Sequence, residues 1–251
     1  MSNHTQAILE RTGQRANVTF RTEAGLNVAS MEFMHELDGV LDELAHDDNI
    51  RFAVFRAEGK AFMAGANIKA MANYNPTEAR TMADLGHAVF DKLEALPQVT
   101  VAALQGAALG GGCEFAMACD FRIAVKTINI GQPEVLLGLI PGWGGTKRLT
   151  QLVGLARAKK MMFTGDSLKG EQALQVGLVD EVVNSEEDLE PLVGAFLTKM
   201  VKAGPQAIAE IKLTLQTGDE IGGFVRCFQR SESKEGMAAF LEKRPTPWSE
   251  K

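Results

Sequence analysis

Two glutamates, Glu114 and Glu134, each lie beside a glycine cluster, where a carboxylate could carry acid–base chemistry. Glu114 is in ALGGGCEFAMACD (108–120), in which three glycines precede a run of small and apolar residues that predicts a helix. Glu134 follows Pro133 in the apolar loop of INIGQPEVLLGLIPGWGGTKRL (128–149). Burial among apolar residues raises the pKa of a carboxylate, which suits a general acid. Together the pair is what proton transfer next to a carbonyl group requires.

Each glutamate also has a purely structural interpretation. Glu114 falls in the first turn of the predicted helix, where a negative charge favours the helix dipole. Glu134 could cap a short helix that Pro133 opens. For either residue alone both interpretations stay open. The occurrence of two such carboxylates, each near glycines and with a strand between them, favours chemistry.

The glycines at 110–112 allow a sharp turn and leave backbone amides uncovered by side chains. A helix that begins there presents unpaired N–H groups and a partial positive charge, which suit a developing oxyanion. A second loop, AFMAGANIKAM (61–71), directly follows the predicted strand IRFAVFR and could bring an amide to the same end of the sheet. By itself this loop is not a specific motif.

Several other kinds of site have little support. The glycines do not form GxGxxG, and GxxxxGK[ST] is absent, which argues against a dinucleotide fold or a P-loop. Without a CxxC pair, the three cysteines predict neither a disulfide framework nor structural zinc. A metal site is improbable because all four histidines lie outside the glycine clusters: His4, His35, His46 and His87.

Composition narrows the class of protein further. The hydrophobic content of 45% is that of an ordinary globular protein, and the net charge of −6 argues against a nucleic-acid partner. No run of eighteen uncharged apolar residues occurs, and the first residues lack the order of a secretory signal. We therefore expect a cytoplasmic protein with neither a nucleic-acid nor a membrane partner.

The chemistry-bearing segments lie between alternating strands and helices, which predicts an α/β fold with buried, parallel-type strands. Apolar residues recur at helical spacing over 31–48, and a second helix is predicted over 76–95. Strands are predicted where β-branched and aromatic residues gather: 7–9, 17–21, 50–56, 99–106 and 121–125.

From about Leu152 the chain becomes mostly helical, and RAKKMMFTG, SLKGEQALQVG and the later segments each read as a helix with its own start or stop signal. We therefore divide the chain into a core that holds the site, 1–194, and a helical C-terminal region, 195–251. VGAFLTKMV and IAEIKLTL carry more apolar surface than a small appendage buries alone, so this region is predicted to form a subunit interface.

Four segments, in order, resemble the crotonase (enoyl-CoA hydratase/isomerase) superfamily: GKAFMAGANIKAM, VAALQGAALGGGCEFAMACDFRIAV, IGQPEVLLGLIPGWGGTKRL and EGMAAFLEKR. The resemblance covers nearly the whole chain from about residue 50. It implies a spiral of ββα units with a helical C-terminal trimerisation region. It also implies assembly as a trimer or a dimer of trimers.

Matched residue by residue, the family's catalytic glutamates fall on Glu114 and Glu134. Its oxyanion-hole amides, which bind the thioester carbonyl, fall on Ala66 and Gly111. Asn67 stands where the family usually has Asp, a change that should leave the backbone amide available. The resemblance assigns coenzyme A contacts to the loop around Ala66 and to the C-terminal helix that closes over the ligand: Ala64, Asn67, Ile68, Lys69, Phe224 and Lys243.

The chain is most similar to an enoyl-CoA hydratase, which adds water syn across the C2–C3 double bond of a 2-enoyl thioester. Glu114 would deprotonate the water that attacks C3, and Glu134 would deliver the proton to C2. No metal or redox cofactor is implied, because the coenzyme is part of the substrate, and fatty acid β-oxidation is the expected setting. The alternatives are a Δ3,Δ2-enoyl-CoA isomerase or a hydratase for dienoyl or cyclic acyl groups. A non-catalytic acyl-CoA binder is disfavoured, because it has no use for two desolvated carboxylates.

Overall fold

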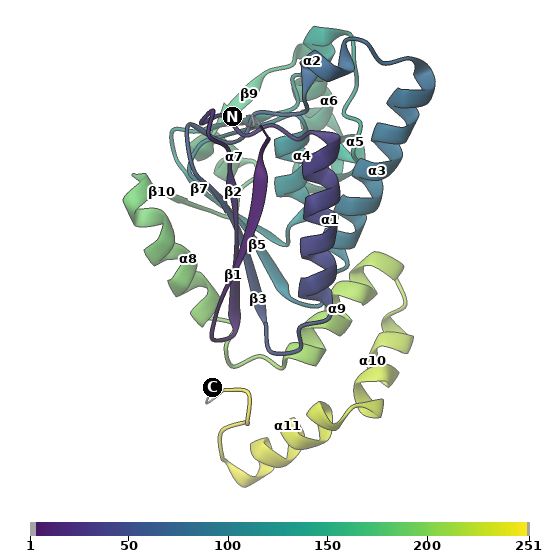
Figure 1. The fold of residues 1–251 in the computed structure, drawn as a ribbon. Coiled ribbons are helices and arrows are strands. Elements are labelled where there is room, and N and C mark those ends of the chain that lie inside the picture. Colours follow the sequence, from purple (N-terminus) through teal and green to yellow (C-terminus); the bar gives the residue numbers. More distant parts are fainter. Residues whose placement is uncertain (1–3, 250–251) are drawn as a thin grey trace.

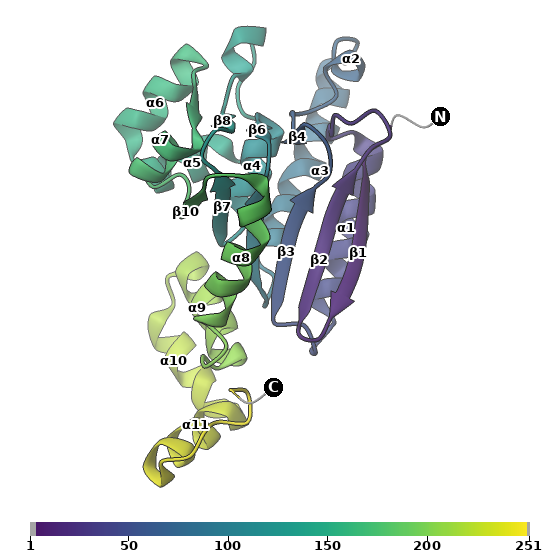
Figure 2. The same ribbon diagram turned by 90° about the vertical axis from the view of Figure 1, so that its left-hand side faces the viewer.

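Two β-sheets and several layers of helices make up residues 4–249, the part of the chain that the computed structural model describes (Figures 1 and 2). The larger sheet has the order β1-β2-β3-β5-β7-β10, and the smaller sheet has the order β4-β6-β8-β9. The larger sheet consists of β1 (Gln6–Thr12), β2 (Arg15–Arg21), β3 (Phe52–Ala57), β5 (Val99–Leu104), β7 (Phe121–Val125) and β10 (Glu181–Val183). The smaller sheet consists of β4 (Ala61–Met63), β6 (Ala107–Leu109), β8 (Asn129–Gly131) and β9 (Ser167–Lys169).

The chain winds as a spiral of strand, strand and helix. In successive turns β3, β5 and β7 enter the larger sheet, and β4, β6 and β8 enter the smaller sheet before the chain leaves as a helix. From β2 to β10 the larger sheet is parallel, and only the β1–β2 pair is antiparallel. The predicted α/β class and the ββα spiral are therefore confirmed.

The helices follow the strands in chain order, and two of the longest begin with the caps that their sequences indicate. Ser30 caps α1 by accepting the N–H of Phe33, and Asn75 forms a capping box with Glu78 at the start of α3. In the core are α1 (Met31–Ala45), α2 (Ile68–Met71), α3 (Pro76–Glu94), α4 (Gly111–Ala118), the 3₁₀ turn η1 (Glu134–Leu137), α5 (Gly145–Val153), α6 (Leu155–Thr164) and α7 (Gly170–Gln175). The 3₁₀ turn η2 (Glu186–Asp188) and α8 (Leu189–Thr198) lead to α9 (Pro205–Thr217), α10 (Glu220–Gln229) and α11 (Ser231–Glu242).

The larger sheet is buried on both faces. Alternate residues of β3 point to opposite sides, so Phe55 packs into the core with α1, α3 and α4 while Val54 packs against α8. Figure 1 shows α8 on one side of the sheet and α1, α3 and α4 on the other. Edge-to-face ring contacts tie the inner core together, with Phe115 of α4 5.2 Å from Phe55 and 5.6 Å from Phe90. This packing fixes the position of α4, which carries Glu114.

Part of the predicted secondary structure was wrong. Residues 167–169, predicted as the start of a helix, form β9, because they pair antiparallel with β8 before the chain turns into α7. The sequence analysis also missed β4, β6, β8 and β10, which have three residues each. The predicted boundary at residue 195 falls inside α8, and α8 packs on the larger sheet through Leu189, Val193 and Leu197.

Helices α9 to α11 form an arm that extends away from the sheets (Figures 1 and 2). The buried guanidinium of Arg51 fastens the start of this arm, because it donates to the carbonyl oxygens of Val201, Ala203 and Trp248 at 3.1, 2.7 and 2.9 Å. The predicted C-terminal region 195–251 ends in two residues that lie outside the described part. Within residues 4–249, no helix is long and apolar enough to cross a membrane.

Candidate active site

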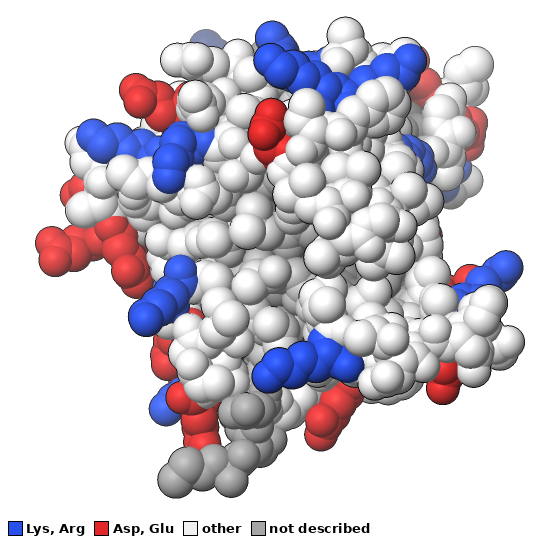
Figure 3. Space-filling model, turned by 90° about the horizontal axis from the view of Figure 1, so that it is seen from above, with Lys and Arg blue, Asp and Glu red and all other residues white. Residues whose placement is uncertain are grey.

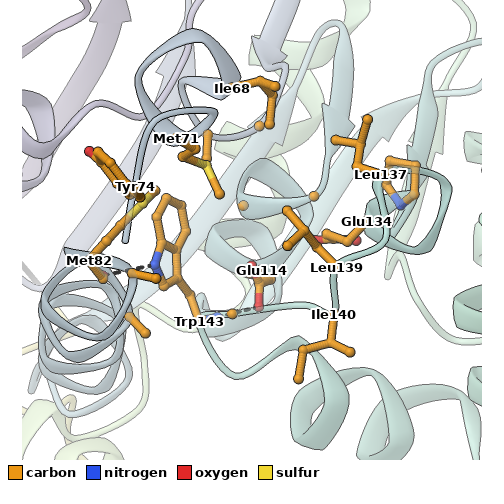
Figure 4. Close-up of a pocket in the computed structure, with 18 of the residues that line it drawn as sticks. Ile68, Met71, Tyr74, Met82, Glu114, Glu134, Leu137, Leu139, Ile140 and Trp143 are labelled. Atoms are coloured by element: carbon orange, nitrogen blue, oxygen red, sulfur yellow. Dashed lines mark hydrogen bonds between the residues drawn. The ribbon is translucent and has the colours of Figure 1, made fainter. Parts of the chain in front are cut away.

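The structure brings Glu114, Glu134, Ala66 and Gly111 to the wall of one cavity of about 620 Å³. Figure 4 shows both carboxylates at this cavity, with Trp143 beside Glu114 and Leu139 beside Glu134. Glu114 comes from the first turn of α4, and Glu134 begins η1 directly after β8. The spiral therefore places together four residues that lie up to 68 positions apart in the chain, on neighbouring ends of β4, β6 and β8.

Glu114 is held by backbone groups of the loop before α5. Its Oε1 accepts the N–H groups of Trp143 at 2.7 Å and Gly145 at 2.8 Å, and the residue is only 2% exposed. Burial raises the pKa of Glu114, and these hydrogen bonds and the nearby Arg148 oppose the rise. Both of these backbone donors bind the same oxygen, so the carboxylate is held in one orientation against this loop.

Glu134 is a weaker acid than an ordinary glutamate. Partial burial raises its pKa to about 7, with a smaller contribution from the negative charge of Glu114. The amide of buried Gln132 lies beside the carboxylate, and with its nitrogen toward Glu134 it donates to Oε1 at 2.7 Å and Oε2 at 3.1 Å. Pro133 is the N-cap residue of the 3₁₀ turn and offers no side-chain cap, and a hydrogen bond from the backbone of Glu134 to its own carboxylate opposes the rise in pKa. The carboxyl group can therefore exchange protons near neutral pH.

Backbone amides complete the site. Ala29 pairs with both neighbours of Ala66, donating to Gly65 O at 2.8 Å and accepting the N–H of Asn67 at 3.1 Å, so the Ala66 N–H points away from this pairing. Gly111 is the first residue of α4, where an N–H has no partner within the helix. Neither N–H donates to another group of residues 4–249. Two free amides at the cavity can together bind an oxyanion.

Two glycines with positive φ let these loops approach each other. Gly65 has φ 111° and Gly110 has φ 52°, which are backbone conformations that side chains disfavour. A Cβ on Gly110 would lie 3.2 Å from Oε1 of Glu134, and one on Gly65 would lie 3.3 Å from the carbonyl oxygen of Leu109. The sharp turn predicted at glycines 110–112 is therefore present, and Gly65 lets the facing loop come close to it.

Of the residues that the resemblance assigns to coenzyme contact, only Ala64 and Ile68 line the cavity, together with Ala66. Asn67 caps α2, accepting the N–H of Ala70 at 3.3 Å, so the replacement of Asp keeps a local turn. Lys69 lies on α2 next to this cap.

The arm residues lie elsewhere in the single chain. Phe224 is on α10 and 65% exposed, and Lys243 ends α11 in a left-handed conformation. Neither of them is among the residues, within 4–249, that line the cavity.

The sequence analysis missed the aromatic and methionine side chains of the cavity, chiefly Trp143, Tyr74, Met71 and Met82. Trp143 is part of the quoted motif PGWGGTKRL, but its place in the cavity could not be predicted, because it contacts α3 and α4, which are distant in sequence. Among residues 4–249, no group of three or more His, Cys, Asp or Glu side chains could hold a metal ion.

Seen from the end of the molecule that carries α2 and β9, charged side chains lie around a broad uncharged surface (Figure 3). Lys and Arg side chains are prominent along its border, with acidic side chains between them. This surface offers an extended ligand an uncharged area with positive charge nearby.

A family model described as enoyl-CoA hydratase/isomerase matches residues 10–251. The chain is 39% identical over 248 residues to a short-chain-enoyl-CoA hydratase from Clostridium acetobutylicum, covering 94% of this chain and 95% of that protein. It is 37% identical over 247 residues to a crotonyl-CoA hydratase from Syntrophomonas wolfei, with 94% and 95% covered. The crystal structure of an enoyl-CoA hydratase from Bacillus anthracis matches with a TM-score of 0.86 at 32% identity, covering 98% of this chain and 100% of that chain.

Proposed function

We propose that Glu114 and Glu134 are the catalytic pair of this protein. The chain belongs to the enoyl-CoA hydratase/isomerase family and is an enoyl-CoA hydratase, which is a hydro-lyase. One observation carries the assignment of the pair. Two carboxylates with raised pKa values border the same cavity as two backbone N–H groups that have no partner in the described chain. Addition of water to a 2-enoyl thioester needs this combination of proton carriers and oxyanion donors.

In this mechanism the amides of Ala66 and Gly111 bind the thioester oxygen and stabilise the enolate-like charge that develops on it. Glu114, held through Oε1, uses Oε2 to orient and deprotonate the water that attacks C3. Glu134, whose pKa of about 7 keeps much of it protonated at neutral pH, delivers a proton to C2. The step leaves Glu114 protonated and Glu134 ionised, and proton exchange with solvent restores both groups before the next turnover.

Crotonyl-CoA tests the activity directly. The purified protein is expected to hydrate it to 3-hydroxybutyryl-CoA, with loss of the ultraviolet absorbance of the conjugated thioester. Product identity is checked by mass spectrometry, since hydration adds one water. A protein that binds the thioester tightly and leaves its absorbance unchanged would be a binder, and the proposed activity would be wrong.

The pH dependence of kcat/KM follows from the two roles. Glu134 must be protonated, and because its pKa is about 7, kcat/KM is expected to fall about tenfold per unit well above that pH. Glu114 must be ionised, and because its pKa is raised, the acidic limb is expected above the pH at which an ordinary glutamate protonates, about 4.3. A profile with crotonyl-CoA between about pH 5 and 10 checks both limbs. A rate that stays constant above neutral pH would contradict the role of Glu134 as proton donor.

The arm is proposed to form a subunit interface in a trimer or a dimer of trimers. Its helices expose an unusual amount of apolar surface in the single chain. Phe224 and Lys243, which lie off the cavity, would reach a coenzyme only in such an assembly. The exposed side chains are Ile211, Leu213, Leu215, Ile221, Phe224, Val225, Phe228, Met237, Phe240 and Leu241.

Sedimentation at micromolar concentration is expected to give a mass that is three or six times the 27.1 kDa of one chain. Replacing exposed apolar residues of the arm, as in Ile221→Glu with Phe240→Glu, should lower this mass, because charge is excluded from an apolar interface. The matched control is Phe163→Glu on α6, another strongly exposed apolar position, outside the arm. A stable monomer of the unmodified protein would contradict the proposed interface.

The proposal also covers the cofactor requirement, the location in the cell and the metabolic role. The reaction as written uses no metal or redox cofactor, since coenzyme A is part of the substrate. A cytoplasmic location is supported by three cysteines that are free in the structure. A role in fatty acid β-oxidation is supported by the substrate class.

A further inference from the structure

The indole of Trp143 forms a rigid inner wall of the cavity. The residue is 4% exposed, its Nε1 donates to the carbonyl oxygen of Met82 at 3.2 Å, and its ring packs edge-to-face on Phe90 at 5.5 Å. Its own backbone N–H is one of the two donors that hold Glu114. In Figure 4 the ring stands between Glu114 and the side chains of Met82 and Tyr74.

The ring occupies space that two glycines leave open. A Cβ on Gly86 of α3 would lie closer than 3.0 Å to the pyrrole edge of the indole, and a Cβ on Gly111 of α4 would lie equally close to its benzo edge. The indole therefore spans the gap between the two helices and touches both backbones. Because a close-packed interior gives little, the ring cannot move toward either helix.

This position matters for an acyl chain. Gly111 is the amide that binds the thioester oxygen under the proposed function, so the benzo edge of Trp143 stands next to the reacting end of the acyl group. An acyl tail that continues past C3 toward the gap between α3 and α4 meets this ring within a few carbon atoms.

We infer that Trp143 is a specificity-determining residue that restricts the enzyme to short 2-enoyl thioesters, an inference that rests on the proposed function. The ring blocks longer tails, and the rest of the apolar wall, from Tyr74 and Met82, contacts a short one.

The test compares kcat/KM for crotonyl-CoA, hex-2-enoyl-CoA and dec-2-enoyl-CoA in the full-length protein and in Trp143→Phe, Trp143→Leu and Trp143→Ala. One methylene in an apolar pocket changes kcat/KM by about 10–200-fold. We therefore expect the ratio of kcat/KM for hex-2-enoyl-CoA to that for crotonyl-CoA to rise about tenfold or more in the folded variant with the smallest side chain at position 143. The rise should follow the loss of side-chain volume. Trp143→Phe and Trp143→Leu keep an apolar filling, so the series is readable even when the Ala variant does not fold.

Phe33→Leu is the matched control, because Phe33 is a buried core aromatic on α1 outside the cavity. It loosens the core to a similar degree and should leave the ratio between substrates unchanged. An unmodified protein that hydrates decenoyl-CoA as fast as crotonyl-CoA, or a folded Trp143→Leu with an unchanged ratio, overturns the inference and leaves the hydratase assignment intact. An unmodified protein that hydrates none of the three thioesters overturns the assignment itself.

Discussion

Replacing Glu114 or Glu134 by glutamine is expected to lower kcat for crotonyl-CoA hydration by about 10²–10⁴-fold, the usual loss when one general acid–base group is removed. Glutamine keeps the shape of each side chain and cannot exchange the proton. In Glu114→Gln, an amide oxygen can still accept the N–H groups of Trp143 and Gly145, so the loop before α5 keeps its anchor. Crotonyl-CoA should still bind, which isothermal titration can measure apart from turnover.

The double variant should be little slower than the slower single variant, because groups that act as a unit are not additive. Glu171→Gln, an exposed glutamate on α7, is the control for the exchange itself and should hydrate normally. One result would replace the two-carboxylate mechanism. If Glu114→Gln is fully active and only Glu134→Gln is inactive, a single carboxylate suffices, as in the 1,3-proton shift of a Δ3,Δ2-enoyl-CoA isomerase.

Removing the N–H of Ala66 or Gly111 is expected to cost about 2.7–4 kcal/mol of transition-state stabilisation, or about 10²–10³-fold in kcat. The reason is that both donors act where charge develops, in a cavity lined mostly by apolar residues that lower the local dielectric constant. Exchange of the Ala66 amide for an ester, by incorporation of the matching α-hydroxy acid, deletes the N–H and keeps the methyl side chain. The same exchange at Gly111 adds no atom next to Trp143.

A side-chain substitution at Gly111 cannot serve this purpose. Any Cβ there would lie closer than 3.0 Å to the indole, so Gly111→Pro or Gly111→Ala would displace Trp143 as well as alter the amide. An ester at Gly13, in the turn between β1 and β2, is the control for the backbone change and should leave turnover normal. Normal turnover with an ester at both Ala66 and Gly111 would show that these amides do not bind the thioester oxygen.

The proposed catalytic pair could be singled out from sequence because its signals are local. Glycines beside Glu114 and the apolar loop around Glu134 indicate exposed amides and a desolvated carboxylate without knowledge of the fold. The same holds for α1 and α3, whose caps and apolar stripes are complete within their own segments. Five strands of the larger sheet were also predicted, because β-branched and aromatic residues gather in them, and only the three-residue β10 was missed there.

The smaller sheet could not be predicted in this way. β4, β6, β8 and β9 have three residues each, too few to show an alternating pattern, and they are strands only because the spiral aligns them. Trp143 was missed for a related reason. Its role depends on Gly86 and Gly111, which lie 57 and 32 positions away and meet the ring only after α3 and α4 have packed.

The boundary of the C-terminal region shows a further limit. The apolar faces of α8 and α9 look alike in sequence, but α8 covers the larger sheet and α9 begins the arm. Which surface a helix covers is decided by tertiary packing, so an amphipathic pattern alone does not distinguish core from interface. The contact of Arg51 with the arm could not be predicted either. Arg51 binds backbone carbonyl oxygens, which every residue has, so no residue type in the sequence indicates the contact.

The contact of one indole with two glycines also constrains the order in which this site can change. While Trp143 is present, a methyl group at position 86 or 111 collides with the ring, so neither glycine can be exchanged first. Once position 143 becomes small, side chains at 86 and 111 can fill the vacated space, and the large ring then cannot return. The three positions therefore depend on one another, and the order of their substitutions matters. A side chain at position 86 or 111 that a chain with a small residue at 143 can accept is damaging in this chain.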